Sequence, residues 1–192
     1  MITNKTVFIL GAGASAPYYY PVGSVLRRQI CDSFHSELHK CITGSPFCGV
    51  DESPVEVQKS LEFTNRFHEC DIKSIDRFLA INPDFSEMGK IAIALFILNA
   101  EVYSSFDETR DDHWYFHLFN KMVDTFNDPD SYMRFGDNKV IFITFNYDRS
   151  LEYYLHKSLR NLFPGKIPED EIVKQLKRIP IYHVYGQVDH LP

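Results

Sequence analysis

The sequence predicts an α/β fold, a Rossmann-like doubly wound parallel sheet with a helical insertion. Three short, mainly apolar runs, at residues 6–10, 139–145 and 179–185, read as strands. The first two have no polar alternation, as expected of strands that are buried on both faces. Glycine or polar residues follow each run, and helical periodicity fills the intervals. Because ligands of open parallel sheets bind at the carboxyl ends of strands, the three strand ends together predict one site.

The first strand, Thr6–Leu10, runs directly into the segment Gly11–Ser15, which reads Gly-Ala-Gly-Ala-Ser. Glycines at the end of a buried strand let backbone N–H groups approach an anion that side chains would block. A helix that began there would add its N-terminal dipole and complete a diphosphate site. A tight turn without a ligand is the alternative. The segment also fits the dinucleotide fingerprint, but Asp32, the acid at the expected spacing, lies within the apolar repeat of a helix, which disfavours hydride transfer.

The middle of the sequence is predicted to be helical. An apolar stripe with a period of four predicts the first of them, and its members are Leu26, Ile30, Phe34, Leu38 and Ile42. A later run, Ile91–Leu98, is apolar nearly all round and predicts a buried helix. The stretch from about 45 to 135 is therefore interpreted as a mostly helical insertion within a single domain that spans residues 1–192.

Composition restricts the partners and the compartment. The 192 residues carry a net charge of -6 with a pI of about 5.7, which argues against a broad nucleic-acid or anionic-membrane surface. The run Ile91–Leu98 is too short to span a bilayer, and the N-terminus does not resemble a signal peptide, so we expect a cytoplasmic protein. No C-x-x-C pair occurs, so we expect neither zinc nor another metal at the four cysteines Cys31, Cys41, Cys48 and Cys70.

Polar residues follow the second and third strands. Asn146 and Asp148 come directly after the second, and His183 lies near the end of the third. Capping of the next helix is an ordinary explanation for Asp148, but a cap needs only one residue, so Asn146 is harder to explain in this way. A lone histidine in a strand is often a hydrogen-bonded core residue, which is the alternative for His183.

Together these blocks resemble the sirtuin-like domains. The Gly-Ala-Gly-Ala-Ser turn, the segment Thr144–Asp148 (Thr-Phe-Asn-Tyr-Asp) and a histidine-containing strand that ends in Gly186 occur in the family's order. Phe145 before Asn146 is closer to the sirtuin-like proteins of bacterial antiphage defence. The resemblance spans most of the chain as three short blocks with a divergent helical middle. It implies an NAD-consuming effector, often assembled with a partner ATPase, Argonaute or sensor.

The resemblance also implies residue roles. Asn146 would hold the nicotinamide ribose and the attacking water, and His183 would be the base. The family's base immediately precedes the glycine, where this chain has Tyr185. Whether His183, Tyr185 or neither residue acts as the base therefore stays open. The paired C-x-x-C ribbon of deacylating sirtuins is absent, which favours NAD hydrolysis over deacylation. The expected NAD-binding residues are Gly11, Ala12, Gly13, Ala14, Ser15, Asp148, Tyr185 and Gly186.

The predicted function is therefore an NAD+ hydrolase that cleaves the nicotinamide–ribose bond and depletes NAD+ in antiphage defence. Cleavage builds oxocarbenium character on the ribose, so the protein mainly fixes the ribose, excludes bulk water and places one water. The alternative is a catalytically weak NAD or ADP-ribose sensor, or an assembly subunit, which Tyr185 favours. We expect a second copy of the chain or a defence protein such as an ATPase as partner. We also expect either a chain truncated after Pro192 or a sheet edge that another chain covers.

Overall fold

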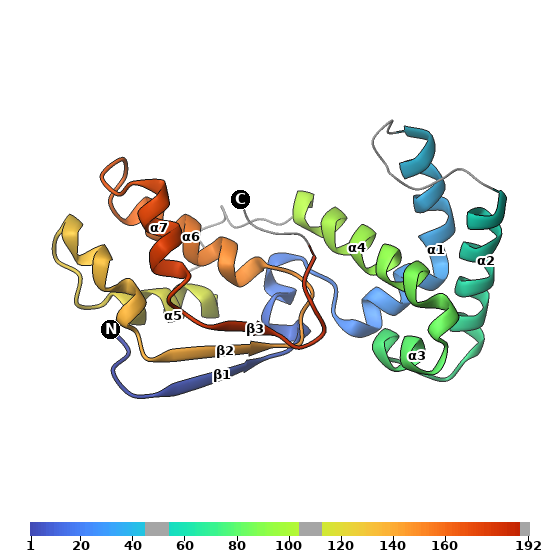
Figure 1. Ribbon diagram of the computed structural model, residues 1–192, viewed down its shortest axis with the longest axis horizontal. Helices are drawn as coiled ribbons and strands as arrows, with labels where there is room; N and C mark the ends of the chain where they lie inside the picture. The colour runs from blue at the N-terminus through green and yellow to red at the C-terminus, as the bar shows by residue number, and fades with distance from the viewer. Residues whose placement is uncertain (45–53, 104–112, 189–192) are drawn as a thin grey trace. The chain divides into compact units, whose positions relative to one another are not determined.

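Helices dominate the structure. The computed structural model describes residues 1–44, 54–103 and 113–188 (Figure 1). Helices account for 65% of it and strands for 8%. The chain divides into two compact units.

Every described element of the second unit, Tyr20–Tyr103, is an α-helix or a 3₁₀ turn. The five residues of the predicted apolar stripe are each at most 8% exposed, which confirms the first predicted helix. The run Ile91–Leu98 lies in one helix as predicted, but Leu98 is 41% exposed, so this helix buries only part of its surface. The elements are α1 (Gly23–Gly44), α2 (Pro54–Glu69), α3 (Ile75–Ile81), the 3₁₀ turn η3 (Pro83–Phe85) and α4 (Ser86–Tyr103).

Phenylalanine rings form the core of this second unit. Phe34, Phe63, Phe67 and Phe78 are completely buried and come from three different helices. The rings of Phe67 and Phe78 lie 4.7 Å apart, and those of Phe34 and Phe63 meet edge to face at 5.7 Å. Such aromatic pairs add to the stabilisation from area burial, and this cluster joins α1, α2 and α3 through their side chains.

The first unit, Met1–Tyr19 with Ser104–Pro192, contains the sheet. Its three strands are parallel and lie in the order β1-β2-β3, with Thr6 opposite Val140 and Thr144 opposite His183. The elements are β1 (Thr6–Leu10), the 3₁₀ turns η1 (Ala12–Ala14) and η2 (Ala16–Tyr18), α5 (Trp114–Val123), η4 (Pro129–Asp137), β2 (Val140–Thr144), α6 (Ser150–Leu162), α7 (Glu169–Leu176) and β3 (Ile181–His183).

One face of this sheet is covered and the other is open. Figure 1 shows α5, α6 and α7 on the same side of the strands. Burial alternates along β2 accordingly: Val140 and Phe142 are 2% and 0% exposed, whereas Ile141 between them is 37% exposed. On the covered face the ring of Phe142 stacks on that of Phe8 at 5.2 Å. On the open face Ile9 is 70% exposed.

The prediction of a Rossmann-like doubly wound sheet with a helical insertion is wrong. A doubly wound sheet adds strands on both sides of its first strand and carries helices on both faces. Here the spatial order of the three strands is their chain order, so β1 lies at an edge of the described sheet. The open face adds a second difference. Apolar runs predict burial on both faces, but a run of apolar residues contains no signal for what covers its second face.

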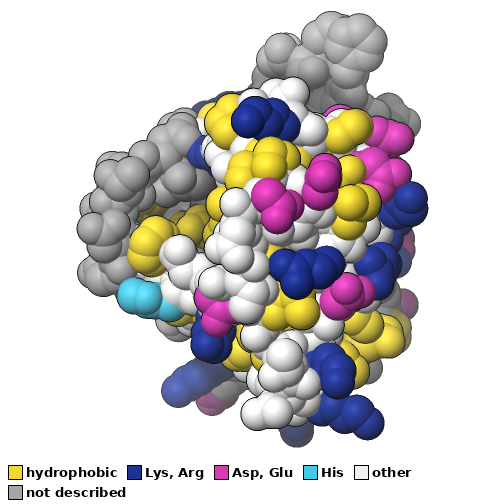
Figure 2. All heavy atoms as spheres, turned by 90° about the vertical axis from the view of Figure 1, so that its left-hand side faces the viewer, with side chains coloured by type: hydrophobic (Ala, Val, Ile, Leu, Met, Phe, Trp, Pro, Cys, Tyr) yellow, Lys and Arg dark blue, Asp and Glu magenta, His cyan; other side chains and the backbone are white. Residues whose placement is uncertain are grey.

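The side of the first unit where α7 lies has a mixed surface. Figure 2 shows Lys and Arg side chains interspersed there with Asp, Glu and hydrophobic side chains. Ion pairs such as Lys174–Glu171, at 2.9 Å, join neighbours on one helix. On the described part of this face neither sign of charge forms a continuous patch.

The two faces of the sheet predict different responses to one substitution. Val140→Thr on the covered face places a hydroxyl among apolar side chains, and we expect it to lower the free energy of unfolding by about 1–3 kcal/mol. Val7→Thr is the matched control because Val7 is 55% exposed on the open face, where a surface substitution changes stability by about 0.5 kcal/mol or less. Urea denaturation measures both. Equal losses in the two variants would contradict the one-sided burial.

Candidate functional site

The glycine turn at the end of β1 is closed by a backbone hydrogen bond. Gly11 is extended, and the N–H of Ala14 donates to its carbonyl at 2.8 Å to close η1. The N–H groups of Ala12 and Gly13 precede this first hydrogen bond of the turn and therefore have no acceptor within it. Two 3₁₀ turns follow β1, so no α-helix begins at the glycine turn. An anion at this turn would meet backbone N–H groups without the dipole of a long helix.

Neither glycine of the turn is required by backbone conformation or by packing. Neither Gly11 nor Gly13 has a positive φ. A Cβ added at either position would meet no other atom within 4 Å. The glycines leave space in front of the turn, so a ligand can reach the main chain there.

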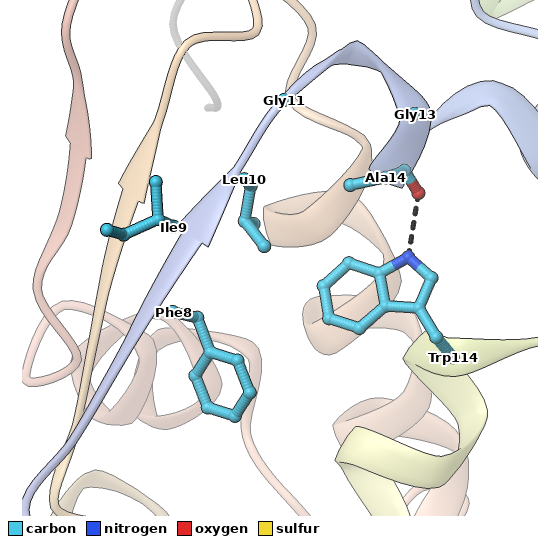
Figure 3. A pocket seen from close by; sticks show the side chains of 7 residues that line it. All are labelled: Phe8, Ile9, Leu10, Gly11, Gly13, Ala14 and Trp114. Atoms are coloured by element: carbon cyan, nitrogen blue, oxygen red, sulfur yellow. Dashed lines mark hydrogen bonds between the residues drawn. The ribbon is translucent and has the colours of Figure 1, made fainter.

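A pocket of about 430 Å³ opens beside this turn (Figure 3). Trp114, the first residue of α5, forms one wall, and its indole N–H donates to the carbonyl of Ala14 at 2.8 Å. Figure 3 shows Phe8 and Leu10 on the side of the indole, whereas the side chain of Ile9 points the other way. None of the lining residues among those that the structure describes is charged: they are Phe8, Ile9, Leu10, Gly11, Gly13, Ala14 and Trp114.

Three of the predicted site residues form one buried hydrogen-bond network. The hydroxyl of Ser15 donates to Oδ2 of Asp148 at 2.7 Å, and the side-chain amide of Asn146 donates to the same hydroxyl at 3.2 Å. All three side chains are buried, with Ser15 completely inaccessible. The network joins the turn after β1 to the loop after β2.

Asp148 also organises the start of α6. Its Oδ1 accepts from the backbone N–H of Ser150 at 3.1 Å and from the Ser150 hydroxyl at 2.5 Å. Because the Ser150 proton points to the carboxylate, the hydroxyl of Tyr115 donates to Ser150, at 2.8 Å. Burial raises the pKa of Asp148, against the opposing effect of the hydrogen bonds from Ser150 and Ser15. The N-cap residue of α6 is Arg149, so Asp148 lies one residue before the predicted capping position. One of its oxygens accepts from the first N–H of the helix, and the other accepts from Ser15.

The side-chain oxygen of Asn146 is a buried acceptor without a hydrogen-bond partner in the described chain. The residue is 7% exposed, and its N–H donates to the Thr144 hydroxyl at 3.0 Å. A cavity of about 10 Å³ lies among Asn146, Asp148 and Glu152. That volume is about the size needed for one water molecule. A buried carbonyl oxygen without a partner costs free energy, so this site favours a donor such as a water or a hydroxyl.

His183 is held by both ring nitrogens. Nδ1 lies 2.9 Å from the backbone carbonyl of Asn146, and Nε2 lies 2.9 Å from Oε1 of Glu152. A carbonyl only accepts, so Nδ1 carries a proton, and an ionised Glu152 requires a second proton on Nε2. Burial alone lowers the pKa of His183, but the hydrogen bonds to Glu152 and Asn146 and the charges of Glu152 and Asp148 outweigh it and raise the pKa. In this arrangement neither nitrogen is free to accept a proton.

Tyr185 and Gly186 lie beyond the end of β3 and outside this network. Tyr185 is 53% exposed, and its ring lies 5.8 Å from that of Phe145, which is also exposed. Gly186 has a φ of 87°, a conformation that side chains rarely adopt, so the glycine is explained by the turn itself. The structure thus brings the side chains of Ser15, Asn146, Asp148 and His183 together. The Tyr185 side chain lies outside this network, and Gly186 contacts His183 only through a backbone hydrogen bond.

Sequence reasoning missed the helical residues of the site. Tyr115 and Glu152 join the network from α5 and α6, and Trp114 forms a wall of the pocket. One feature of the sequence pointed to Trp114, because it is the chain's single tryptophan. No feature of the sequence pointed to Glu152, because a glutamate in the first turn of a helix is common on any surface.

The described residues include no group of three or more His, Cys, Asp or Glu side chains placed to hold a metal ion. Cys31 and Cys70 are free thiols, and Cys48 lies outside the described residues. None of the described helices combines the length and the apolar character that crossing a bilayer requires.

Comparison with known proteins gives no relative for this chain. No model of a known family, no curated protein and no solved structure matches it.

The His183–Glu152 pair predicts a pH dependence. The folded protein holds the His183 proton more tightly than the unfolded chain, so the pair stabilises the fold below about pH 6.5 and this contribution is lost as pH rises through the raised pKa. Glu152→Gln removes the largest charge partner. We expect a lower pKa for His183, measured by NMR titration of its ring proton, and a smaller loss of thermal stability between about pH 6 and 8.

Glu169→Gln is the matched control for this prediction. Glu169 contacts the ring of His156 at 2.5 Å but is 59% exposed, so screening by water leaves this second pair with little effect on stability. The same titration should leave His183 unchanged in this variant. An unaltered His183 pKa in Glu152→Gln would show that the pair is not formed in solution.

Proposed function

We propose that this chain is an NAD+ glycohydrolase, which breaks the bond between nicotinamide and ribose. The observation that carries the proposal is the environment of Asn146. Its buried Oδ1 has no hydrogen-bond partner in the described chain and lies beside a cavity of about one water's size. Its side-chain amide is hydrogen-bonded to Ser15, at the end of the glycine turn. An amide can donate and accept at once, which suits a group that positions a water against a sugar.

The proposed chemistry places few demands on the protein. The C–N bond of the nicotinamide riboside breaks with its electron pair going to nicotinamide, and the oxygen of a water bonds to the resulting oxocarbenium carbon. Because that carbon is strongly electrophilic, the water can lose its proton to solvent after the bond forms. A free base is then unnecessary, in keeping with a His183 whose two nitrogens are both engaged. The network around Asp148 would hold Asn146 rigid for this task.

The binding half of the proposal rests on the glycine turn. The N–H groups of Ala12 and Gly13 are suited to the diphosphate, since backbone donors bind anions without net positive charge. The adjoining pocket, about 430 Å³, lies within the usual range for ligand sites of about 300–1,000 Å³. Ser15 is fully buried, so we assign it to the support of Asn146 and not to direct contact with the diphosphate.

A second candidate function is a sensor that binds NAD+ or ADP-ribose without hydrolysis. The engagement of His183 with Glu152 favours it, because a family-type base would need a free ring nitrogen. The two functions differ in one observable. A sensor gains thermal stability from ADP-ribose and releases no nicotinamide from NAD+, alone or assembled.

The wider biological role follows from the sirtuin-like motifs alone. Their resemblance supports an effector that depletes NAD+ in antiphage defence, with a second copy of the chain or a partner ATPase. The same resemblance supports a cytoplasmic location, where NAD+ is available.

Replacing Asn146 tests the hydrolase. Asn146→Ala removes the group that would hold the water, and we expect nicotinamide release from NAD+ to fall by about 100-fold or more. Asn161→Ala is the matched control, because Asn161 lies exposed in the last turn of α6. Release that survives Asn146→Ala would contradict the assigned role. No release by the unaltered protein, with ADP-ribose still bound, would make the chain a sensor.

Adding a methyl group to the turn tests the binding half. Gly13→Ala meets no atom of the chain within 4 Å, so we expect an unchanged thermal midpoint but at least about tenfold weaker binding of ADP-ribose, because the methyl group blocks close approach to the backbone. Gly23→Ala adds a methyl group in equally open space at the start of α1, and calorimetry should find its affinity unaltered. Full affinity in Gly13→Ala would remove the turn from the binding site.

A further inference from the structure

We propose that the pocket beside Trp114 binds the adenine base of the dinucleotide, with the indole of Trp114 as its stacking partner. This inference rests on the proposed function, because it assigns one end of that substrate. Its first support is the lining: the described residues of the walls are aromatic, aliphatic or glycine, and none of them carries charge. A flat, uncharged group fits such a wall, whereas the diphosphate is better served by the backbone of the neighbouring turn.

Trp114 is held in place before any ligand arrives. Its N–H is bonded to the carbonyl of Ala14, so the indole is tied to the glycine turn itself. The next residue, Tyr115, is 1% exposed and its ring packs against the indole at 4.4 Å. The indole is only partly buried and borders the pocket (Figure 3). A fixed aromatic ring offers stacking surface with little loss of side-chain entropy on binding.

The pocket also contains main-chain groups that suit the edge of a base. The backbone polar groups of Thr6 and Leu10 point toward β2, because the N–H of Thr6 donates to the carbonyl of Lys139 and the carbonyl of Leu10 accepts from the N–H of Phe145. The backbone N–H and carbonyl of Ile9 therefore point away from β2, where no described strand pairs with β1. One donor and one acceptor at this edge match the donor and acceptor on the edge of adenine.

The position of the pocket fixes which end of the substrate it receives. Leu10 borders both this pocket and the small cavity beside Asn146, and the glycine turn follows Leu10 directly. A dinucleotide with its diphosphate at the turn has one end at Asn146, where the proposed bond cleavage occurs. Its other end, the adenosine, is then the part available to Trp114.

The chain's single tryptophan makes the test direct. Trp114 is the only source of tryptophan fluorescence, so its emission reports on this pocket. We expect AMP and ADP-ribose to change the emission saturably, and ribose 5-phosphate, which lacks the base, to leave it unchanged. Equal responses to AMP and ribose 5-phosphate, or no response to any of the three, would overturn the assignment.

Two variants separate the stacking from the fold. In calorimetry we expect Trp114→Leu to weaken AMP binding by at least about fivefold, the lower end of the effect of losing one base–aromatic stack. Trp114→Phe keeps an aromatic ring and should stay within about threefold of the unaltered protein. Undiminished AMP affinity in Trp114→Leu would refute the adenine site.

The outcome for the proposed function is read separately, as nicotinamide release by the unaltered protein. Release together with an unresponsive Trp114 would overturn the adenine site and leave the hydrolase standing. AMP binding at Trp114 without release would support the adenine site and remove the hydrolase.

Discussion

The hydrogen bond between Ser15 and Asp148 is the contact on which the site depends. It joins residues 133 positions apart and ties the turn after β1 to the loop after β2. Asp148 uses its other oxygen to fix the first turn of α6, so one carboxylate sets the mutual position of two strand ends and a helix. Asn146 is oriented in turn by its bond to Ser15. Burying this carboxylate is unfavourable, as its raised pKa records, and the donors around it offset that cost.

Adjacent parallel strands explain why the sequence could predict the proximity of the site residues. The carboxyl ends of such strands meet at one edge of a sheet, so Ser15, Asn146 and His183 were expected near one another once three strands had been recognised. The strands themselves were visible as apolar runs, and α1 was visible from its apolar stripe, all five members of which are buried. Local composition determines elements of this kind.

The remainder depends on contacts that local composition does not encode. The sequence contains no signal for the spatial order of the strands or for the open second face of the sheet, and the doubly wound prediction failed on both. Glu152 and Tyr115 reach the network because α5 and α6 present particular sides to the strands, and the rotation of a helix about its axis is set by packing. The same applies to His183: the residue was recognised, but its engagement through both nitrogens depends on a glutamate from another element.

The division of the chain has a consequence for the order of folding. The second unit is continuous from Tyr20 to Tyr103, so its contacts are complete while the ribosome is still synthesising the rest of the chain. The first unit is discontinuous: β1 emerges first but pairs with β2, which follows the whole helical unit. Closing so long a loop is entropically slow, and β1 waits unpaired during translation. The glycine turn that follows β1 is therefore synthesised before the helical unit but reaches its native surroundings only after β2 has been made.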